Sequence, residues 1–313
     1  MLNKAFFQLV ITAAMVVSSP SPPAPSRQGG PDVYVPPYAT LPPTPVLPRS
    51  AFQGTARINN IDLWYARYGP SLECGHTPVV MLHGGKISSQ WWTPQIKYLA
   101  SQGYPVIAID TRAHGRSTDD PTVPLSYDLF ADDAAALLKH LNVKRASFVG
   151  WSDGANTCLS LAMRHGDIVD RCFAFGANYR FDQLNITGLL GIPFLADVAA
   201  RQENEWKALS PTGPEGWASF KARMDVLQGT MPVWDGGDFA KIKTLYQDPK
   251  KAPIMWIADG DSEEIVLRQV AGEIRDMIWG SSLVTLPGVG HFAPLQDPDT
   301  FDALLDRFLT LRR

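Results

Sequence analysis

The feature that most constrains the fold is a sharp turn motif near the middle of the chain. It reads Gly150-Trp151-Ser152-Asp153-Gly154, follows a short strand-like run at 146–149, and opens an apolar, helix-like stretch. A serine between two glycines at such a turn adopts strained backbone geometry, which pushes its hydroxyl out above a sheet. Ser152 is therefore a candidate nucleophile, placed between a strand and a helix.

A five-residue motif also arises by chance, so the prediction depends on whether its partners are present. Residues 78–82 form an apolar, strand-like run that leads into His83-Gly84-Gly85. A loop of this kind can turn backbone N–H groups toward an oxygen that gains negative charge during a reaction. We expect the N–H groups of Gly85 and Asp153 to be these oxyanion donors. His83 is expected to hold the loop in shape.

A general base and an acid are expected later in the chain. The strand-like run 282–286 leads through a glycine-rich loop to His291, where the base belongs when the order along the chain is serine, acid, histidine. Another apolar run, 253–258, lies between the serine and this histidine and ends in Asp259-Gly260-Asp261-Ser262-Glu263-Glu264. The acid must come from this cluster.

Five segments in this order resemble the α/β-hydrolase fold over roughly residues 51–313. They are 82–85, 110–117, 150–154, 174–178 and 290–292. The resemblance implies an α/β domain with an eight-stranded, mostly parallel sheet flanked by helices. Its antiparallel edge would be the hairpin of residues 56–59 and 61–68. A helical lid would be inserted at about residues 179–250.

The resemblance also guides the choice of the acid. In similar proteins the acid follows a strand in the pattern G-x-x-D. Laid on Gly260, this pattern places Glu263 at the acid position, with glutamate where aspartate is usual. Asp261, two residues away and shorter, is the alternative acid. Asp259 is expected to be a strand-end residue.

The activity that this resemblance implies is that of a serine hydrolase acting on a carboxylic ester or lactone. His291 would accept the proton of the Ser152 hydroxyl, and Glu263 would hold the imidazole in the useful tautomer. An acyl-enzyme would form and would then be released by water. An aspartate in place of the serine would instead point to alkyl-enzyme chemistry.

Two other kinds of function stay open. C–C bond hydrolases and aminopeptidase-like acyl hydrolases are similar, but such relatives typically have proline after the double glycine, where this chain has Lys86. A non-catalytic, ligand-binding protein of the same fold could also keep both Ser152 and His291.

Aromatic and methionine side chains are concentrated near the expected site. Trp151 and Trp91 are expected to line the substrate pocket. Within the expected lid, helical patterns occur at 203–209, 214–227 and 239–246. The large apolar residues there would either contact an apolar group of the substrate or form the core of the lid itself. These residues are Trp206, Trp217, Phe220, Met224, Met231 and Trp234.

The composition narrows the class of protein further. With 313 residues, of which 45% are hydrophobic, the chain can bury the core of one large domain. A net charge of −3, with both signs interspersed, leaves no basic face, so we expect no nucleic-acid partner. The histidines fall in no metal-binding spacing, so we expect no metal and no cofactor. The expected partner is a small, apolar, ester-type molecule.

The first fifty residues are expected to lie outside the catalytic domain. Lys4 precedes an apolar run that ends near Val17 and is too short to span a membrane comfortably. Residues 1–19 are therefore interpreted as a cleaved signal peptide, and the proline-rich residues 20–50 as an extended arm. The protein is expected to be secreted or periplasmic, with no stable membrane insertion after cleavage.

Two further sequence features depend on the cellular compartment. Asn185 begins an N-x-T sequon, which matters only if a eukaryotic secretory pathway makes the chain. Cys158 and Cys172 are expected to be separate, buried, small residues, although a pair of the three cysteines could form a bridge.

Overall fold

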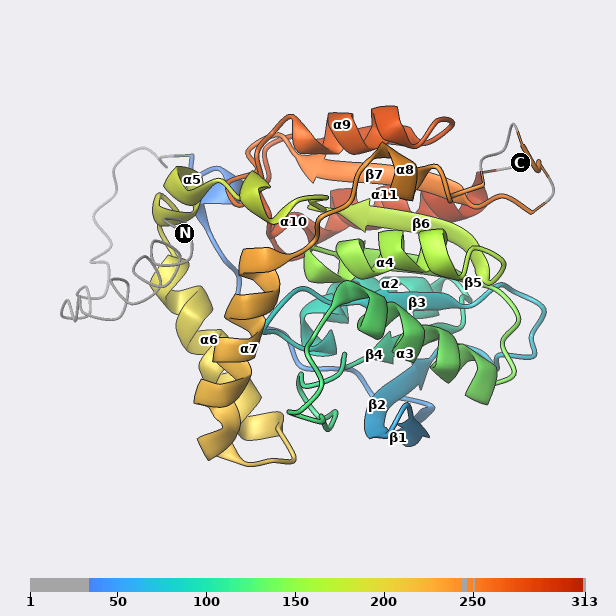
Figure 1. Cartoon of the computed structure of the whole chain (residues 1–313), viewed down its shortest axis with the longest axis horizontal. Helices are drawn as coiled ribbons and strands as arrows, with labels where there is room; N and C mark the ends of the chain where they lie inside the picture. The colour runs from blue at the N-terminus through green and yellow to red at the C-terminus, as the bar shows by residue number, and fades with distance from the viewer. Residues whose placement is uncertain (1–33, 244–246, 250, 312–313) are drawn as a thin grey trace.

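Within residues 34–243, 247–249 and 251–311, which the computed structural model describes, eight strands form one sheet (Figure 1). The strands are β1 (Phe52–Ile58), β2 (Ile61–Tyr68), β3 (Val79–Leu82), β4 (Val106–Ile109), β5 (Ala146–Trp151), β6 (Val169–Phe175), β7 (Ile254–Gly260) and β8 (Ser282–Leu286). Their order across the sheet is β1-β2-β4-β3-β5-β6-β7-β8.

The sheet is parallel except at one edge, where β2 pairs antiparallel with both β1 and β4. Asn59 and Asn60 connect β1 to β2 with positive φ angles of 42° and 66°, as two-residue hairpins require. The inner strands β3 and β4 are buried throughout, as is typical of strands with helices on both faces. The α/β class and the eight-stranded, mostly parallel sheet are confirmed, although β1 begins at Phe52, before residue 56.

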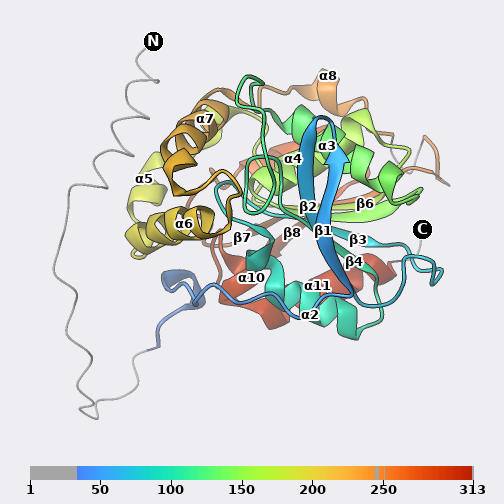
Figure 2. The ribbon, with the colours of Figure 1, turned by 90° about the horizontal axis from the view of Figure 1, so that it is seen from below.

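Helices cover both faces of the sheet (Figure 2). On one face lie α3 (Tyr127–His140) and α4 (Asp153–Arg164), with α9 (Val270–Met277) in the same core. On the other lie α2 (Thr93–Ser101), which follows the short helix η2 (Ser89–Trp92), and α11 (Pro298–Thr310), which follows α10 (Ala293–Gln296). The second core is rich in aromatic rings. Phe173, Phe301 and Phe308 are completely buried there, and each stabilises the fold by about 2–3 kcal/mol.

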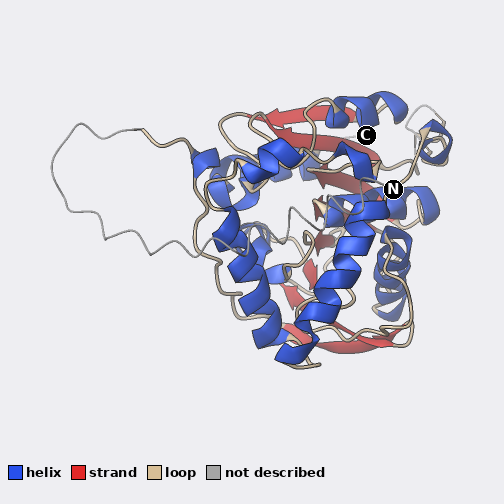
Figure 3. Ribbon diagram, turned by 60° about the vertical axis from the view of Figure 1, so that its left-hand side comes forward, coloured by secondary structure: helices blue, strands red, loops and turns tan. Residues whose placement is uncertain are grey.

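Between β6 and β7 the chain leaves the sheet and forms a group of helices, which we call the lid helices. They are η3 (Phe181–Gln183), α5 (Ile186–Leu190), α6 (Leu195–Leu209), η4 (Pro214–Gly216), α7 (Trp217–Thr230) and α8 (Gly236–Phe239). Helices α5, α6 and α7 stand beyond the carboxyl ends of the parallel strands, and Figure 3 brings this side forward. Helix α8 lies apart from them, and its Phe239 packs in the core that α3, α4 and α9 share. Helix α6 begins eight residues before the predicted start at 203, and part of the pattern at 239–246 lies outside the described residues.

Aromatic rings hold the lid helices together and attach them to the domain. Trp206 of α6 stacks on Phe220 of α7 with ring centroids 5.2 Å apart, and its indole N–H donates to the carbonyl of Ala113 at 2.9 Å. Met224 is completely buried in the same cluster. Most of the large apolar lid residues therefore form the core of the lid, and only Trp217 and Met231 also reach the cavity described below.

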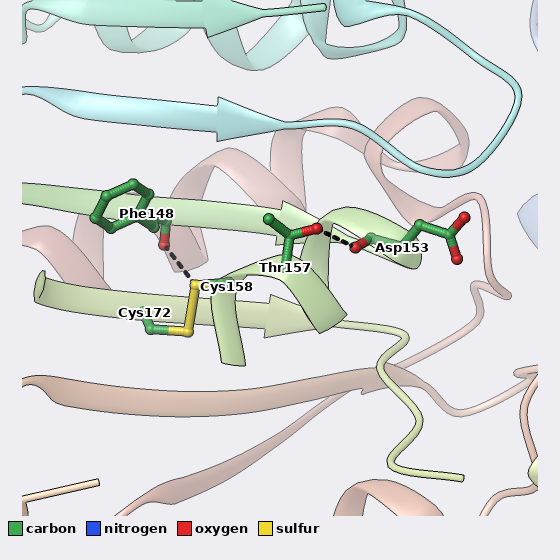
Figure 4. Close-up of a disulfide and its surroundings, with 5 residues drawn as sticks. All are labelled: Phe148, Asp153, Thr157, Cys158 and Cys172. Atoms are coloured by element: carbon green, nitrogen blue, oxygen red, sulfur yellow. Dashed lines mark hydrogen bonds between the residues drawn. A yellow bond between two sulfur atoms is a disulfide. The ribbon is translucent and has the colours of Figure 1, made fainter. Parts of the chain in front are cut away.

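A disulfide joins Cys158 on α4 to Cys172 on β6 (Figure 4). The two Cα atoms are 6.2 Å apart, which is within the range for disulfides, and both side chains are completely buried. The expectation that they are separate small residues was therefore wrong. Both cysteines lie where α4 packs against β6, and a helix-to-sheet contact of this kind brings together residues that are 14 apart in sequence.

The described part of the proline-rich arm, from residue 34 to residue 50, lies against the domain and the lid (Figure 2). The N–H of Tyr38 donates to the carbonyl of Gly288 at 3.3 Å, and Arg201 of α6 donates to the carbonyl of Leu41 at 3.3 Å. One 3-10 turn, η1 (Pro37–Ala39), interrupts its extended course. The predicted signal peptide, residues 1–19, lies outside the described residues. None of the helices in the described ranges is long and apolar enough to cross a membrane.

Candidate active site

Ser152 occupies the turn between β5 and α4 in strained backbone geometry. Its φ and ψ angles are 57° and −119°, so it is a non-glycine residue in a region that L-residues rarely adopt. The turn can form because two glycines allow close approach. A Cβ atom on Gly154 would overlap the carbonyl oxygen of Leu82, and one on Gly150 would overlap that of Gly154. The strain is of the kind that is retained at functional sites.

His291 and Glu263 are in direct contact beneath the lid helices. Nδ1 of His291 is 2.9 Å from both carboxylate oxygens of Glu263, and both side chains are only 3% exposed. Glu263 Oε1 also accepts the N–H groups of Ile265 at 2.8 Å and Val266 at 2.9 Å, which fix the carboxylate in place. A carboxylate held in this way binds the Nδ1–H tautomer of His291 and leaves Nε2 free to accept a proton.

The alternative acid, Asp261, lies elsewhere. Its side chain is exposed and accepts the N–H of Gly288 at 2.9 Å and the hydroxyl of Ser262 at 3.1 Å. Asp261 therefore holds the loop that leads to His291 and does not contact the imidazole. The structure brings Glu263, the residue favoured by the resemblance, into contact with the imidazole of His291.

The charges of this pair reinforce one another. Burial opposes the imidazolium, but the charge of Glu263 and its hydrogen bond, aided by Glu264 and Asp153, outweigh burial and raise the pKa of His291. Burial likewise opposes the carboxylate, but His291 and the hydrogen bonds from Asp259 and Val266 outweigh it and lower the pKa of Glu263. Glu263 therefore stays ionised.

Asp259, at the end of β7, is a second carboxyl behind Glu263. Burial, followed by the charge of Glu263 and the hydrogen bond to it, raises the pKa of Asp259 well above its usual range. In its protonated form Asp259 can donate to Glu263 without adding a second negative charge at this point. Asp259 lies at the end of β7, as predicted. Its contact with Glu263 was not predicted from the sequence.

Ser152 and His291 open into the same cavity. Gly176 provides the room for the imidazole, since a Cβ atom there would lie 2.7 Å from Cε1 of His291. The Ser152 hydroxyl makes no hydrogen bond to any described residue, so the serine and the histidine face one space without yet sharing a proton. Such hydrogen bonds are often loose without substrate and tighten when it binds.

The two predicted oxyanion donors also line this cavity. Gly85 follows β3, and Asp153 is the first residue of α4. Neither backbone N–H donates to another group in the described part of the chain, so both are free to bind an oxygen. The amino-terminal end of α4 adds its dipole at the same place, which favours negative charge there.

His83 fixes the loop of residues 83–86, which contains the predicted donor Gly85 and which we call the oxyanion loop. Its Nδ1 lies 2.7 Å from the carbonyl oxygen of Gly84, and its Nε2 accepts the N–H of Thr111 at 3.0 Å. Burial lowers the pKa of His83, so the ring is neutral and can act as donor on one side and acceptor on the other. This arrangement agrees with a role in holding the loop rather than in proton transfer.

The cavity has a volume of about 410 Å³ and lies between the strand ends and the lid helices. Its apolar wall comes mostly from α5, α6 and the loop before α9. The wall includes Leu189, Ile192, Leu195, Val198, Ile265 and Phe292. Trp151 lines it as predicted, but Trp91 does not. Trp91 is completely buried behind Trp151, with ring centroids 5.9 Å apart, and donates its indole N–H to Glu205 at 2.9 Å.

A polar side of the cavity was not predicted from the sequence. It contains Lys86 of the oxyanion loop, together with Lys221 and Gln228 of α7. Nζ of Lys86 donates to Asp225 of α7 at 2.8 Å and to Gln228 at 2.9 Å. These residues carry no sequence motif, and only the packing of α7 over the oxyanion loop makes them part of the site. In the described ranges, His, Cys, Asp and Glu side chains form no group of three that could hold a metal ion.

Two known hydrolases are similar in sequence to this chain. The chain is 27% identical over 257 residues to the serine hydrolase BPHL of Homo sapiens, covering 80% of this chain and 84% of the relative. It is 25% identical over 276 residues to the bifunctional esterase/perhydrolase DCH of Acinetobacter calcoaceticus, covering 80% and 97%.

Solved structures show the same architecture. The enol-lactonase from Burkholderia xenovorans LB400 superimposes with a TM-score of 0.62 at 22% identity, covering 82% of this chain and all of that one. At this level of identity the likeness concerns the fold. The sequence model of the alpha/beta hydrolase family matches residues 79–304, which is most of the chain and contains Ser152, Glu263 and His291. The chain therefore belongs to the alpha/beta hydrolase family.

Proposed function

We propose that the protein is a serine hydrolase that cleaves a carboxylic ester or lactone through an acyl-enzyme on Ser152. The contact between His291 and Glu263, in the cavity into which Ser152 opens, carries this proposal. A hydroxyl is a weak nucleophile at neutral pH until a base takes its proton. The strained turn, the oriented imidazole and two unoccupied N–H donors are the parts that such a reaction needs.

The chemistry follows from the positions of these groups. Ser152 Oγ attacks the carbonyl carbon while its proton passes to Nε2 of His291, and the N–H groups of Gly85 and Asp153 bind the oxygen that becomes negative. The C–O bond then breaks, and the alcohol leaves with the proton from His291. Water next gives a proton to His291 and attacks the acyl carbon, and Ser152 recovers its proton as the acid departs.

The cavity supports a substrate with a sizeable apolar part. Leucine and valine side chains of α5 and α6, with Ile192 between the two helices, form one wall, and about 410 Å³ is enough for a small organic ester. The names of the relatives, an esterase/perhydrolase and a serine hydrolase, favour acyl transfer in general. C–C hydrolysis is the second candidate, because a meta-cleavage product hydrolase superimposes with a TM-score of 0.64 at 19% identity.

We also propose that the protein works outside the cytoplasm, as a secreted or periplasmic enzyme. The charged and apolar pattern of residues 1–19 supports export. The disulfide between Cys158 and Cys172 supports it independently, since such bonds persist mainly in oxidising compartments. Cell fractionation of the expressing organism, with detection of the cleaved chain, tests this proposal.

A fluorophosphonate probe and a series of p-nitrophenyl esters test the proposed reaction. Wild type should be labelled and should hydrolyse at least one ester, whereas Ser152→Ala should be unlabelled and lose at least about 10⁴-fold in kcat/KM. Ser219→Ala, at an exposed serine on α7, is the matched control and should behave as wild type. Absence of labelling and turnover in the folded wild type would favour the non-catalytic, ligand-binding alternative.

A further inference from the structure

Helix α7 turns a polar stripe toward the oxyanion donors. Lys221, Asp225 and Gln228 are spaced by four and three residues, so they lie on one face of the helix. The adjacent face, with Phe220, Met224 and Leu227, is apolar and packs in the core of the lid. The stripe is partly buried, and polar groups in such a place are costly unless they are paired.

Each polar group of the stripe is paired. The hydrogen bonds reach both the loop that contains Gly85 and the side chain of Asp153. Gln228 Oε1 accepts from Nζ of Lys86 at 2.9 Å, and Gln228 Nε2 donates to Asp153 Oδ2 at 3.0 Å. Asp225 accepts from Lys86 at 2.8 Å and from Lys221 at 2.7 Å. The side-chain amide of Gln228 therefore connects Lys86, the residue after Gly85, to the side chain of Asp153.

The amide of Gln228 lies directly over Gly85. A Cβ atom on Gly85 would overlap both Nε2 of Gln228 and Oδ2 of Asp153, so a larger residue here would displace this contact. Lys86, the next residue, has a φ of 63°, which an L-residue retains only when its surroundings fix it. The hydrogen bonds to Asp225 and Gln228 supply that constraint on the oxyanion loop.

The same contacts moderate a charge that would otherwise oppose the reaction. Asp153 donates its backbone N–H to the oxyanion while its carboxyl group stands beside the same site. Burial raises the pKa of Asp153, and hydrogen bonds from Tyr127 and Gln228 with the charge of Lys86 act in the opposite direction. Both oxygens of the carboxyl group accept a hydrogen bond, Oδ1 from the Tyr127 hydroxyl at 2.9 Å and Oδ2 from Gln228 at 3.0 Å, so part of its charge is taken up by these donors.

We propose that Gln228, together with Lys86, is a positioning residue that fixes the separation of the two oxyanion donors, so that docking of α7 completes the oxyanion site. This inference rests on the proposed function of Ser152. The donors belong to separate loops after β3 and β5, and an error of about 1 Å in such a site costs on the order of 100-fold in rate. A stripe that served stability alone could be apolar, since apolar replacements of buried ion pairs are often neutral or stabilising.

The test compares three variants. Gln228→Met keeps the length of the side chain and removes both hydrogen bonds, Lys86→Met breaks the same connection from the other end, and Val226→Ala changes the exposed face of α7 as a control. We expect Gln228→Met and Lys86→Met to lower kcat for a p-nitrophenyl ester by about 10- to 100-fold, with KM within about threefold. The rate of inactivation by a fluorophosphonate, which also places an oxygen in the oxyanion site, should fall by a similar factor. Val226→Ala should match wild type in all measurements.

A double variant separates positioning from independent effects. If Lys86 and Gln228 act through one connection, combining the two changes should cost little more than the larger single loss. Losses that multiply, an unchanged kcat in Gln228→Met, or a rise in KM alone would each overturn the inference. If wild type neither turns over esters nor reacts with the probe, the proposed function fails and this inference with it. If wild type is active and Gln228→Met is equally active, only this inference fails.

Discussion

The contact between Glu263 and His291 gives the sharpest prediction about the reaction. In the transition state of the proposed reaction the imidazole carries a positive charge, and its Nδ1 is 2.9 Å from both oxygens of Glu263. At an effective dielectric constant of about 20, unit charges at this separation attract by about 6 kcal/mol. Because each factor of ten in rate corresponds to about 1.4 kcal/mol, loss of the charge corresponds to about 10⁴-fold. Both charges are delocalised, so this is an upper limit.

Glu263→Gln is the variant that removes the charge while preserving the shape. We expect kcat/KM for a p-nitrophenyl ester to fall by about 10³- to 10⁴-fold, since the amide also presents an N–H where Nδ1–H needs an acceptor. Asp261→Asn is the matched control, because Asp261 is exposed and its carboxylate accepts from Ser262 and Gly288, not from the imidazole. It should stay within about threefold of wild type.

Two results would refute the reasoning about the acid. A Glu263→Gln enzyme with more than about a tenth of wild-type kcat/KM would mean that the charge does not stabilise the imidazolium during the reaction. A larger loss in Asp261→Asn than in Glu263→Gln would mean that Asp261 approaches His291 in the working enzyme. Circular dichroism of both variants checks that each is folded.

Two further predictions follow from the surroundings of His291. Because its pKa is raised, the imidazole gives up its proton only above pH 6.5, so kcat/KM should rise with pH through a midpoint above 6.5, and in Glu263→Gln this midpoint should move lower. The charged imidazole stabilises the folded state below pH 6.5, and this stabilisation is lost as the pH rises through the raised pKa of His291. An activity midpoint below pH 6.5 would contradict the raised pKa. Gly176→Ala, with a φ of 66° and a Cβ 2.7 Å from His291 Cε1, should lower kcat/KM by about 100-fold. Gly288→Ala is the control, because Gly288 has a similar φ of 72° but open space around its Cβ position, so this variant should keep its activity. Equal activity of the two variants would mean that contact with His291 does not cause the loss in Gly176→Ala.

Much of the architecture follows from local patterns in the sequence. The apolar runs before His83, Ser152 and Asp259 are strands β3, β5 and β7, because a short apolar run that ends in glycines or polar residues has few other ways to be buried. The glycines around Ser152 predict the strained turn, since close backbone approach excludes a Cβ atom. These predictions need only neighbours in the chain.

Other predictions failed or stayed open because they depend on contacts between distant segments. Trp91 was expected in the pocket, yet it is buried behind Trp151, since the sequence does not show how η2 rotates against the sheet. The bond between Cys158 and Cys172 depends on the position of α4 over β6. Sequence spacing favoured Glu263 without excluding Asp261. Only the path of the loop between β7 and α9 shows that Glu263 contacts His291 and that Asp261 does not.

The sequence by itself determined the kinds of element and their order, because hydrophobic periodicity and glycine positions act over a few residues. The tertiary structure decided which carboxylate meets His291 and which lid residue reaches the oxyanion loop. Glu263 is 28 residues from His291, and Gln228 is 75 residues from Asp153. Contacts at such separations depend on how the whole sheet and its inserted helices pack together, and no local pattern encodes them.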